Sequence, residues 1–519
     1  MSPYTPVPVP ATPSPNAGTS VIAITSTAER REIAASVATT TFVNCHLAAP
    51  AVLENQRKPV DLVVVLDRSG SMHGDKLALC KRTMDFLAHQ LAPHDRVSLV
   101  SYDSDVTTDM PLTKMNDQGK ANLAQKVKCI QAGSCTNLSG GLVAGVEEVQ
   151  RPTRLDNGEP NPVQSVLLLT DGQANEGVTG PDSLAKLLGG LLGPQVSLHT
   201  FGYGSDHNAT LLGRLADIGR GSYYFIQNVD GVALAFARCL GGLLSVVGQN
   251  IKLEVVASPG ALIASVKTKR PVMTVADKVH VEIDLGDMFA EESRDVLVEV
   301  QLTPQVPSEK MEIVEFRVRY VNVLQSTMEK ETSVVTIGRP ARVEHDDDDT
   351  VDEVIVAQKL RIAAVEAIES AQAEANKGNL DQGKRFLRSA IELVQRDMAT
   401  LSVNAQATMA ILLADLDECT VNMASQSVYQ SRGQGRTQQK IQTHWMQRQN
   451  NVEVEEDCLL DCDDGFAIFC SSSNDDDEDV DKAAPRRQAA APAPAPGGYA
   501  GIGNAMQRQM MKKAFKVTK

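Results

Sequence analysis

Five side chains with oxygen donors stand in an order and spacing suited to a metal ion. Two are carboxylates and three are hydroxyls: Asp67, Ser69, Ser71, Thr136 and Asp171. Asp67 follows the apolar run 62–66, and Asp171 follows the apolar run 166–169 and one threonine. Ligands bind where the strands of an open α/β sheet end, so we expect these side chains to meet there. Hard oxygen donors favour Mg²⁺, with Mn²⁺ or Ca²⁺ as alternatives, over Zn²⁺ or Cu²⁺.

Alternative roles fit the same residues less well. A single Asp, Ser or Thr at such a place is more often a turn or a helix cap, but five in order favour a site. An aspartyl phosphatase also carries an aspartate after an apolar strand, yet it needs a second carboxylate where this chain has Ser69. Gly202 and Gly204 lack the third glycine of a dinucleotide-binding loop. We therefore predict a binding site, with no catalytic residue and no enzyme activity.

The elements that must position these residues alternate between strand and helix. Apolar strand-like runs are followed by amphipathic, helix-like segments in five successive pairs. The expected strands are 61–66, 96–102, 163–170, 196–202 and 223–226, and the expected helices are 77–91, 119–130, 183–192, 210–218 and 232–246. This alternation predicts a doubly wound, Rossmann-like α/β fold with a parallel sheet and helices on both faces.

Strands with a period of two flank this block on both sides. They are 21–24 and 39–47 before it, and 251–256, 279–285, 294–302, 313–321 and 331–337 after it. Two strands are too few to fold alone. We therefore expect one small antiparallel β-sandwich, made of 19–57 plus 248–343, into which an α/β domain of residues 58–247 is inserted.

The remaining segments are helical or of biased composition. An acidic linker, 344–353, leads into a helical region, 354–430, where apolar residues spaced by three and four predict a helical hairpin or a three-helix unit. We interpret it as a packed structural unit, with Asn379 as the N-cap of its second helix. We expect disorder in 1–18 and in a tail, 431–519, that is acidic and then basic. The stretch 508–519 has the composition of a short basic amphipathic helix that touches a membrane or an acidic partner.

Charge and cysteine content narrow the class of protein. The 519 residues include 50 basic and 65 acidic residues, for a net charge of −15, which argues against a nucleic-acid partner. Much of the acidity lies in the segments 344–353 and 453–482. Nine cysteines, mostly scattered, favour a reducing compartment, and the late group Cys458, Cys462 and Cys470 has weak zinc-site spacing. With neither a signal peptide nor a transmembrane segment in the sequence, we predict a cytoplasmic protein.

The five oxygen donors also resemble a known motif. The set Asp67-x-Ser69-x-Ser71, Thr136 and Asp171-Gly172 is similar to the metal-ion-dependent adhesion site (MIDAS) of von Willebrand factor type A (VWA) domains. The resemblance covers about residues 59–247, and the stretch 199–208 is similar to the late part of such domains. It implies that the three hydroxyls coordinate the ion and that the two aspartates act directly or through water. An acidic residue of a partner protein would then complete the coordination.

The order of segments further resembles plant ubiquitin ligases that carry a RING zinc domain ahead of a VWA domain. Residues 1–58 contain only Cys45 and His46 as soft-metal ligands, so ligase activity does not follow from the resemblance. The expected function is a metal-dependent, protein-binding adaptor or scaffold. One alternative is a substrate-recognition subunit or relative of a ubiquitin ligase, which implies ubiquitin-pathway partners. Another is a purely structural metal, and the acidic tail could also occupy the site in cis.

Overall fold

A six-stranded sheet forms the α/β domain. The structure is a computed structural model, and it describes residues 21–52, 56–151, 159–343, 351–447 and 503–517. The strand order is β5-β4-β3-β6-β7-β8, with every pair parallel except β4 and β5. The strands are β3 (Val60–Asp67), β4 (Arg96–Tyr102), β5 (Val106–Lys114), β6 (Val163–Thr170), β7 (Val196–Tyr203) and β8 (Arg220–Ile226). The edge strand β5 is absent from the sequence prediction, because Pro111 and several exposed polar residues interrupt its pattern.

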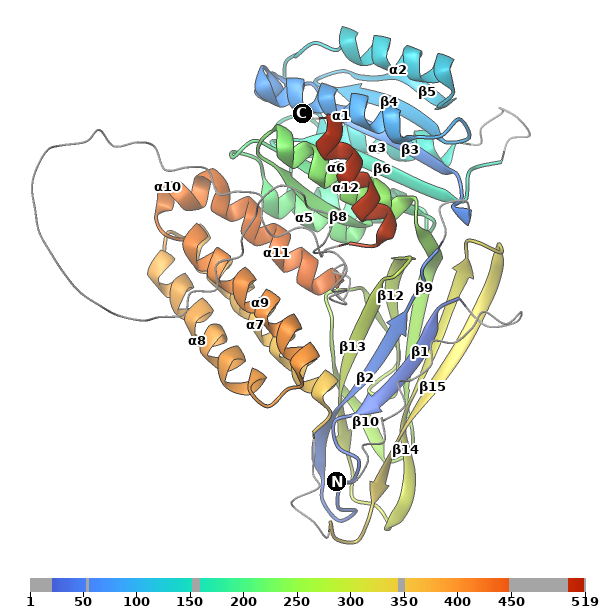
Figure 1. Cartoon of the computed structure of the whole chain (residues 1–519), viewed down its shortest axis with the longest axis vertical. Helices are drawn as coiled ribbons and strands as arrows, with labels where there is room; N and C mark the ends of the chain where they lie inside the picture. The colour runs from blue at the N-terminus through green and yellow to red at the C-terminus, as the bar shows by residue number, and fades with distance from the viewer. Residues whose placement is uncertain (1–20, 53–55, 152–158, 344–350, 448–502, 518–519) are drawn as a thin grey trace, which may run out of the picture. The chain divides into compact units, whose positions relative to one another are not determined.

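Helices cover both faces of this sheet, which confirms the doubly wound fold (Figure 1). One face packs on α1 (Asp75–Gln90), α2 (Asp117–Cys129) and α6 (Val229–Leu243), and the other on α3 (Leu138–Gln150), α4 (Pro181–Leu191) and α5 (Ala209–Ile218). Alternate residues of β3 enter the two cores, with Leu62 and Val64 on one side and Val63 and Val65 on the other. Because both faces are buried, the strands are continuous apolar runs, which is the pattern that made them visible in the sequence.

The flanking strands form the predicted antiparallel sandwich. One sheet has the order β1-β2-β13-β10 and the other β11-β12-β9-β14-β15. Their bounds are β1 (Ala23–Ala28), β2 (Thr39–Ala48), β9 (Val246–Ala257), β10 (Ala261–Lys267), β11 (Val272–Ala276), β12 (His280–Phe289), β13 (Ser293–Leu302), β14 (Ser308–Asn322) and β15 (Thr327–Arg339). β2 pairs with β13 from Thr39 opposite Leu302 to Ala48 opposite Ser293. Segments on either side of the α/β domain thus share one sheet, so the domain is inserted as expected.

Two details of the sandwich differ from the sequence prediction. The expected helix 232–246 ends at Leu243, and β9 begins at Val246, because this apolar stretch suits a buried helix and a buried strand equally. Strands β10 and β11 are additional, and β11 is exposed along its length. An exposed short strand has no inward-facing apolar row, so a period-two pattern does not mark it.

The helical region holds the three expected helices with shifted boundaries. They are α7 (Glu353–Asn376), α8 (Leu380–Met398) and α9 (Val403–Asn422). The end of the expected acidic linker 344–353 belongs to the first of them, since Asp352 caps α7 by accepting a hydrogen bond from Ile355 N at 3.1 Å. Asn379 precedes α8 but makes no cap, and its side chain instead donates to Glu374 at 2.9 Å.

Two segments of the expected disordered tail 431–519 are helical. After α10 (Gln426–Val428) and a π-helical turn, η4 (Tyr429–Gly433), the chain forms α11 (Gln434–Met446), and α12 (Ala505–Val517) follows near the C-terminus. In α11 the side-chain amide of Gln442 accepts from Tyr223 N and donates to Gly213 O and to Asp217. Composition did not predict α11, because polar amides rather than apolar residues dock it on the α/β domain. Residues 448–502, with the three late cysteines, lie outside the described residues.

Among the helices of the described residues, none combines the length and the apolar character that crossing a bilayer requires.

A buried ion pair ties together the amino ends of β3, which leads to the candidate site, and its neighbour β4. Asp61 on β3 is fully buried and accepts from Arg96 Nε at 2.7 Å and Nη2 at 2.6 Å. It also accepts from the backbone N of Asn161 at 2.9 Å. Removing one partner of such a pair leaves an uncompensated buried charge.

We predict that Asp61→Asn lowers the free energy of unfolding by about 3–5 kcal/mol, because Arg96 keeps its charge in the interior. Urea denaturation followed by far-UV circular dichroism measures this change. Glu315→Gln is the matched control, because its pair with Arg317 is exposed and its loss should cost less than about 1 kcal/mol. Equal effects of the two substitutions would contradict the prediction.

Candidate metal-binding site

The first loop of the site follows the central strand β3. Asp67, its last residue, is fully buried. One carboxylate oxygen accepts from Ser69 N at 2.8 Å, and the other accepts from the hydroxyl of Thr170 at 2.6 Å. The chain then makes a 3₁₀ turn, η2 (Gly70–Met72), in which the Ser69 and Ser71 hydroxyl oxygens lie 3.1 Å apart. The structure therefore brings the first three predicted ligands together.

The second loop carries Thr136 and lies against the first. Gly70 N donates to Ser134 O at 2.8 Å, which joins the two loops. Thr136 is buried, and its backbone is held on both sides by Asn175, whose side chain accepts from Thr136 N at 2.8 Å and whose N donates to Thr136 O at 3.2 Å. Asn175 belongs to the loop that follows β6. All three loops thus converge at the carboxyl end of the sheet, as the sequence predicts.

The third loop presents Asp171. This residue is fully buried, and Gly172 after it has φ of +70°, a conformation that glycine adopts without strain. One carboxylate oxygen of Asp171 accepts from Lys76 Nζ at 3.1 Å. The same ammonium lies 2.7 Å from Asp206, which is more than half exposed. Lys76 therefore links the buried carboxylate to a carboxylate on the rim.

The electrostatics of the site are set by burial of two negative groups. Burial raises the pKa of Asp67 to about 6, although hydrogen bonds from Ser69 and Thr170 favour its charged form, and the charge of Asp171 raises the pKa further. Burial lowers the pKa of Lys76, but its contacts with Asp206 and Asp171 outweigh that effect and raise it above the ordinary value. Lys76 stays charged and compensates one carboxylate, so the pair keeps an excess of buried negative charge.

The donor set fits a hard divalent cation. Two carboxylates and three hydroxyls are oxygen ligands of the kind that Mg²⁺ prefers, and a dication would compensate the buried charge. Within the described ranges, no group of three or more His, Cys, Asp or Glu side chains is placed to hold a metal ion. The candidate set is consistent with that finding, because it contains only two such side chains and takes its other donors from hydroxyls.

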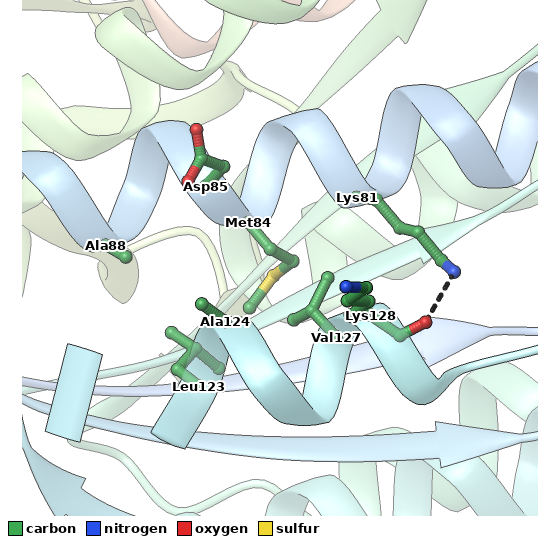
Figure 2. A pocket seen from close by; sticks show the side chains of 8 residues that line it. All are labelled: Lys81, Met84, Asp85, Ala88, Leu123, Ala124, Val127 and Lys128. Atoms are coloured by element: carbon green, nitrogen blue, oxygen red, sulfur yellow. Dashed lines mark hydrogen bonds between the residues drawn. The ribbon is translucent and has the colours of Figure 1, made fainter. Parts of the chain in front are cut away.

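A hollow of about 270 Å³ lies elsewhere in the domain, between α1 and α2 (Figure 2). Its apolar lining includes Met84, Leu123 and Val127, and none of the five predicted ligands lines it. At one end the Lys81 ammonium donates to the backbone oxygen of Lys128 at 3.2 Å. This hollow is therefore separate from the candidate metal site.

Four residues that shape the site were not found from the sequence. Thr170 orients Asp67, Asn175 fixes Thr136, and Lys76 and Asp206 set the charge next to Asp171. Lys76 and Asp171 are 95 positions apart, and no spacing rule connects them. The one available signal is that Thr170 and Asn175 flank Asp171 within a few residues.

Comparison with known proteins identifies the kind of domain that carries the candidate site. Residues 61–236 match the model of the von Willebrand factor type A domain. The E3 ubiquitin-protein ligase WAV3 of Arabidopsis thaliana is 30% identical over 252 residues, which cover 48% of this chain and 32% of WAV3. The uncharacterized protein sll0103 of Synechocystis is 27% identical over 281 residues, which cover 53% of this chain and 64% of that protein. The chain thus spans less than two thirds of either relative.

A solved structure shares the fold over most of the chain. The von Willebrand factor type A protein from Catenulispora acidiphila superposes with a TM-score of 0.63 at 16% identity, covering 82% of this chain and 96% of that one. The α/β domain is therefore a VWA domain, a module that typically mediates protein interactions. The shared fold extends beyond that domain, because the superposition covers 82% of this chain, whereas the family match covers only residues 61–236.

We predict that the metal-free protein loses stability as pH rises from about 4 to about 6, through the raised pKa of Asp67. In this window the folded chain holds a proton on Asp67 that the unfolded chain, with an ordinary pKa near 4, has released. Asp67→Asn removes the effect, so at pH 7 in chelator the variant should be more stable than the wild type by about 3 kcal/mol.

Urea denaturation of both proteins in chelator, at pH values from 4 to 7, measures this difference. Asp105→Asn is the control, because Asp105 is exposed on the neighbouring loop. A constant gap between the wild type and Asp67→Asn across this range would contradict the prediction.

Proposed function

We propose that the VWA domain captures an acidic side chain of a partner protein through a divalent cation, Mg²⁺ in the first place. The ligands would be the five residues predicted from the sequence: Asp67, Ser69, Ser71, Thr136 and Asp171. The observation that carries the proposal is the meeting of two fully buried carboxylates with the paired hydroxyls of Ser69 and Ser71. Such burial is costly unless a positive charge compensates it.

Each residue has a role that its contacts support. The Ser69 and Ser71 hydroxyls lie on one turn and Thr136 on the facing loop, so they would donate oxygen from two sides. Asp67, which Thr170 orients, and Asp171, which accepts from Lys76, would bind the ion directly or through water. A Mg²⁺ ion held by two carboxylates and neutral hydroxyls keeps positive character, which is what attracts a further carboxylate. Ser71 is exposed, which leaves one side of the site open to a partner.

A binding role fits the surroundings of the site better than catalysis. The buried His207 lies near it in space, on the loop from which Asn208 N donates to Asp171 O. Both nitrogens of His207 are engaged, with Nδ1 2.6 Å from Gly204 O and Nε2 2.5 Å from the Tyr223 hydroxyl. Burial lowers the pKa of His207, so it remains neutral and bonded within the fold. It is therefore placed as a structural residue, and we propose a non-enzymatic adaptor or scaffold.

A second candidate function rests on the similarity to WAV3. That relative is named as an E3 ubiquitin-protein ligase, and the matched region covers about half of this chain. We propose as the alternative that the chain recognises substrates for ubiquitination. In that case ubiquitin-pathway proteins would be among its partners. A purely structural metal at the same site is a third possibility, which the response of the fold to chelator separates from the first two.

We predict that Thr136→Ala weakens Mg²⁺ binding at least tenfold and abolishes Mg²⁺-dependent partner capture, because one hydroxyl donor is lost while the buried backbone contacts to Asn175 remain. Titration calorimetry with Mg²⁺ measures the first effect. Affinity purification with Mg²⁺ and with chelator, followed by mass spectrometry, measures the second. Thr108→Ala is the matched control, since Thr108 is an exposed threonine of the same domain.

The outcomes distinguish the candidates. Partner capture that survives excess chelator would contradict the metal bridge. Loss of the folded domain on chelation would instead indicate a structural metal. Reproducible recovery of ubiquitin-conjugating enzymes would favour the second function over a general adaptor.

We also predict that Lys76→Met tightens Mg²⁺ binding about tenfold, because an ammonium that competes for Asp171 is removed, which by Coulomb's law is worth about 1–2 kcal/mol at partial burial. Calorimetric titration with Mg²⁺ checks this. Lys81→Met, on the same helix, is the control, because Lys81 donates to backbone oxygens at the end of α2. Weaker binding by Lys76→Met would mean that the lysine positions Asp171 rather than competing for it.

A further inference from the structure

The C-terminal helix α12 packs on the VWA domain beside α6 (Figure 1). Three of its methionines, Met506, Met510 and Met511, are 9%, 3% and 6% exposed and belong to the same core as α1 and α6. The sequence pattern predicted an amphipathic helix here, but for a membrane or an acidic partner. In the structure these three methionines are covered by this chain's own domain.

Polar contacts fix the start of α12 in one position. The Asn504 side chain caps the helix by accepting from Gln507 N at 2.9 Å, and its amide donates to Ser245 Oγ at 2.7 Å and Ala290 O at 3.0 Å. Gln507 in turn donates to Arg238 O at 2.8 Å. These bonds reach residues on both sides of the end of α6. Because these hydrogen bonds are directional, they fix the position of α12 along α6, which apolar packing alone would not do.

The surface of α6 is shaped for a helix at one point in particular. A Cβ atom added at Gly241 would lie 2.7 Å from Gln507 Cα and 2.9 Å from Gln507 N. Because these are backbone atoms, the clash could be relieved only by moving α12 itself. A glycine inside a helix costs about 1 kcal/mol relative to alanine. At Gly241 the absence of a side chain permits the close approach of α6 and α12, which offsets that cost.

The length of the connecting segment does not fix where α12 lies. Between Met446, the last residue of α11, and Gly503 there are 56 residues, 447–502. A segment of that number of residues can span at most ~180–200 Å, so its length alone is compatible with many positions of α12. A 13-residue helix is also marginal in water on its own. The noncovalent contacts with α6 are therefore what keep α12 helical and docked.

We propose that α6 carries a binding site for a short methionine-rich amphipathic helix, and that α12 is a detachable occupant of this site. Methionine suits that role, because its flexible thioether side chain adapts to irregular surfaces and is common at binding surfaces that can repack. The site is separate from the proposed metal site and uses none of its ligands. When α12 leaves, the same site accepts residues 503–519 supplied in trans.

The first test uses the full chain and two glycine substitutions. Gly241→Ala places a Cβ against α12, whereas Gly190→Ala, near the end of α4, meets nothing within 4 Å. Both changes raise the helix propensity of the helix that carries them, by a similar amount. They therefore differ mainly in their effect on the packing of α12. Hydrogen–deuterium exchange should show at least tenfold faster exchange of the 505–517 amides in Gly241→Ala only. Unchanged exchange in α12, or equally faster exchange throughout the VWA domain, would overturn the proposal.

The second test supplies the helix in trans. In the full chain, Asn504→Ala combined with Met510→Ala weakens the resident helix without touching α6. A fluorescent synthetic peptide of residues 503–519 should bind this variant at least tenfold more tightly than it binds the wild type, as measured by anisotropy. Adding Gly241→Ala should remove that binding.

The weakened variant could also dimerise. Dissociation of such dimers by the peptide would support the proposal, because α12 of a second copy would then occupy the same site. Absence of peptide binding to the weakened variant would overturn it.

Discussion

The parallel pairing of β3 with β6 is the constraint on which the candidate site depends. In this register Leu66 lies opposite Leu169, so the residues that follow, Asp67 and Thr170, emerge together and form the 2.6 Å hydrogen bond that orients the carboxylate. Asp171 comes one residue later on the same edge. A shift of the register would separate the two carboxylates. The candidate site would then lose the concentrated negative charge that is proposed to bind a cation.

The same arrangement creates an electrostatic problem that the protein compensates only in part. Burial and the nearby charge of Asp171 raise the pKa of Asp67, and Lys76 provides one positive charge, which it shares between Asp171 and Asp206. A fully compensated pair would be a structural ion pair with little need of a ligand. The proposed dication, and through it an acidic group of a partner, would supply the compensation that is missing. In this proposal the buried negative charge that destabilises the metal-free domain is also what binds the ion.

Elements far apart in sequence support the VWA domain. The sandwich is built from strands on both sides of the insertion, because β2 before the domain pairs with β13 after it. The chain enters the domain from β2 and leaves it into β9, which belongs to the other sheet of the sandwich. Helix α11 adds buried amide contacts at β8 and α5, and α12 adds methionine packing at α6. Side-chain amide hydrogen bonds dock α11 on the domain, whereas methionine packing docks α12. The segment that joins α12 to the preceding helix is also the longer one.

The sequence by itself determined the fold class and the membership of the candidate site. Strands buried on both faces must be apolar throughout, and ligands at strand ends must keep their type and order, so both leave local patterns around Asp67 and Asp171. Tertiary structure alone decided the edge strand β5, the docking of α11 and α12, and the roles of Lys76 and Asn175. Those features depend on contacts between residues tens to hundreds of positions apart, made by amides, methionines and single charges. Such contacts produce no periodic pattern in the sequence, because each depends on where the contacted residue lies in the folded structure.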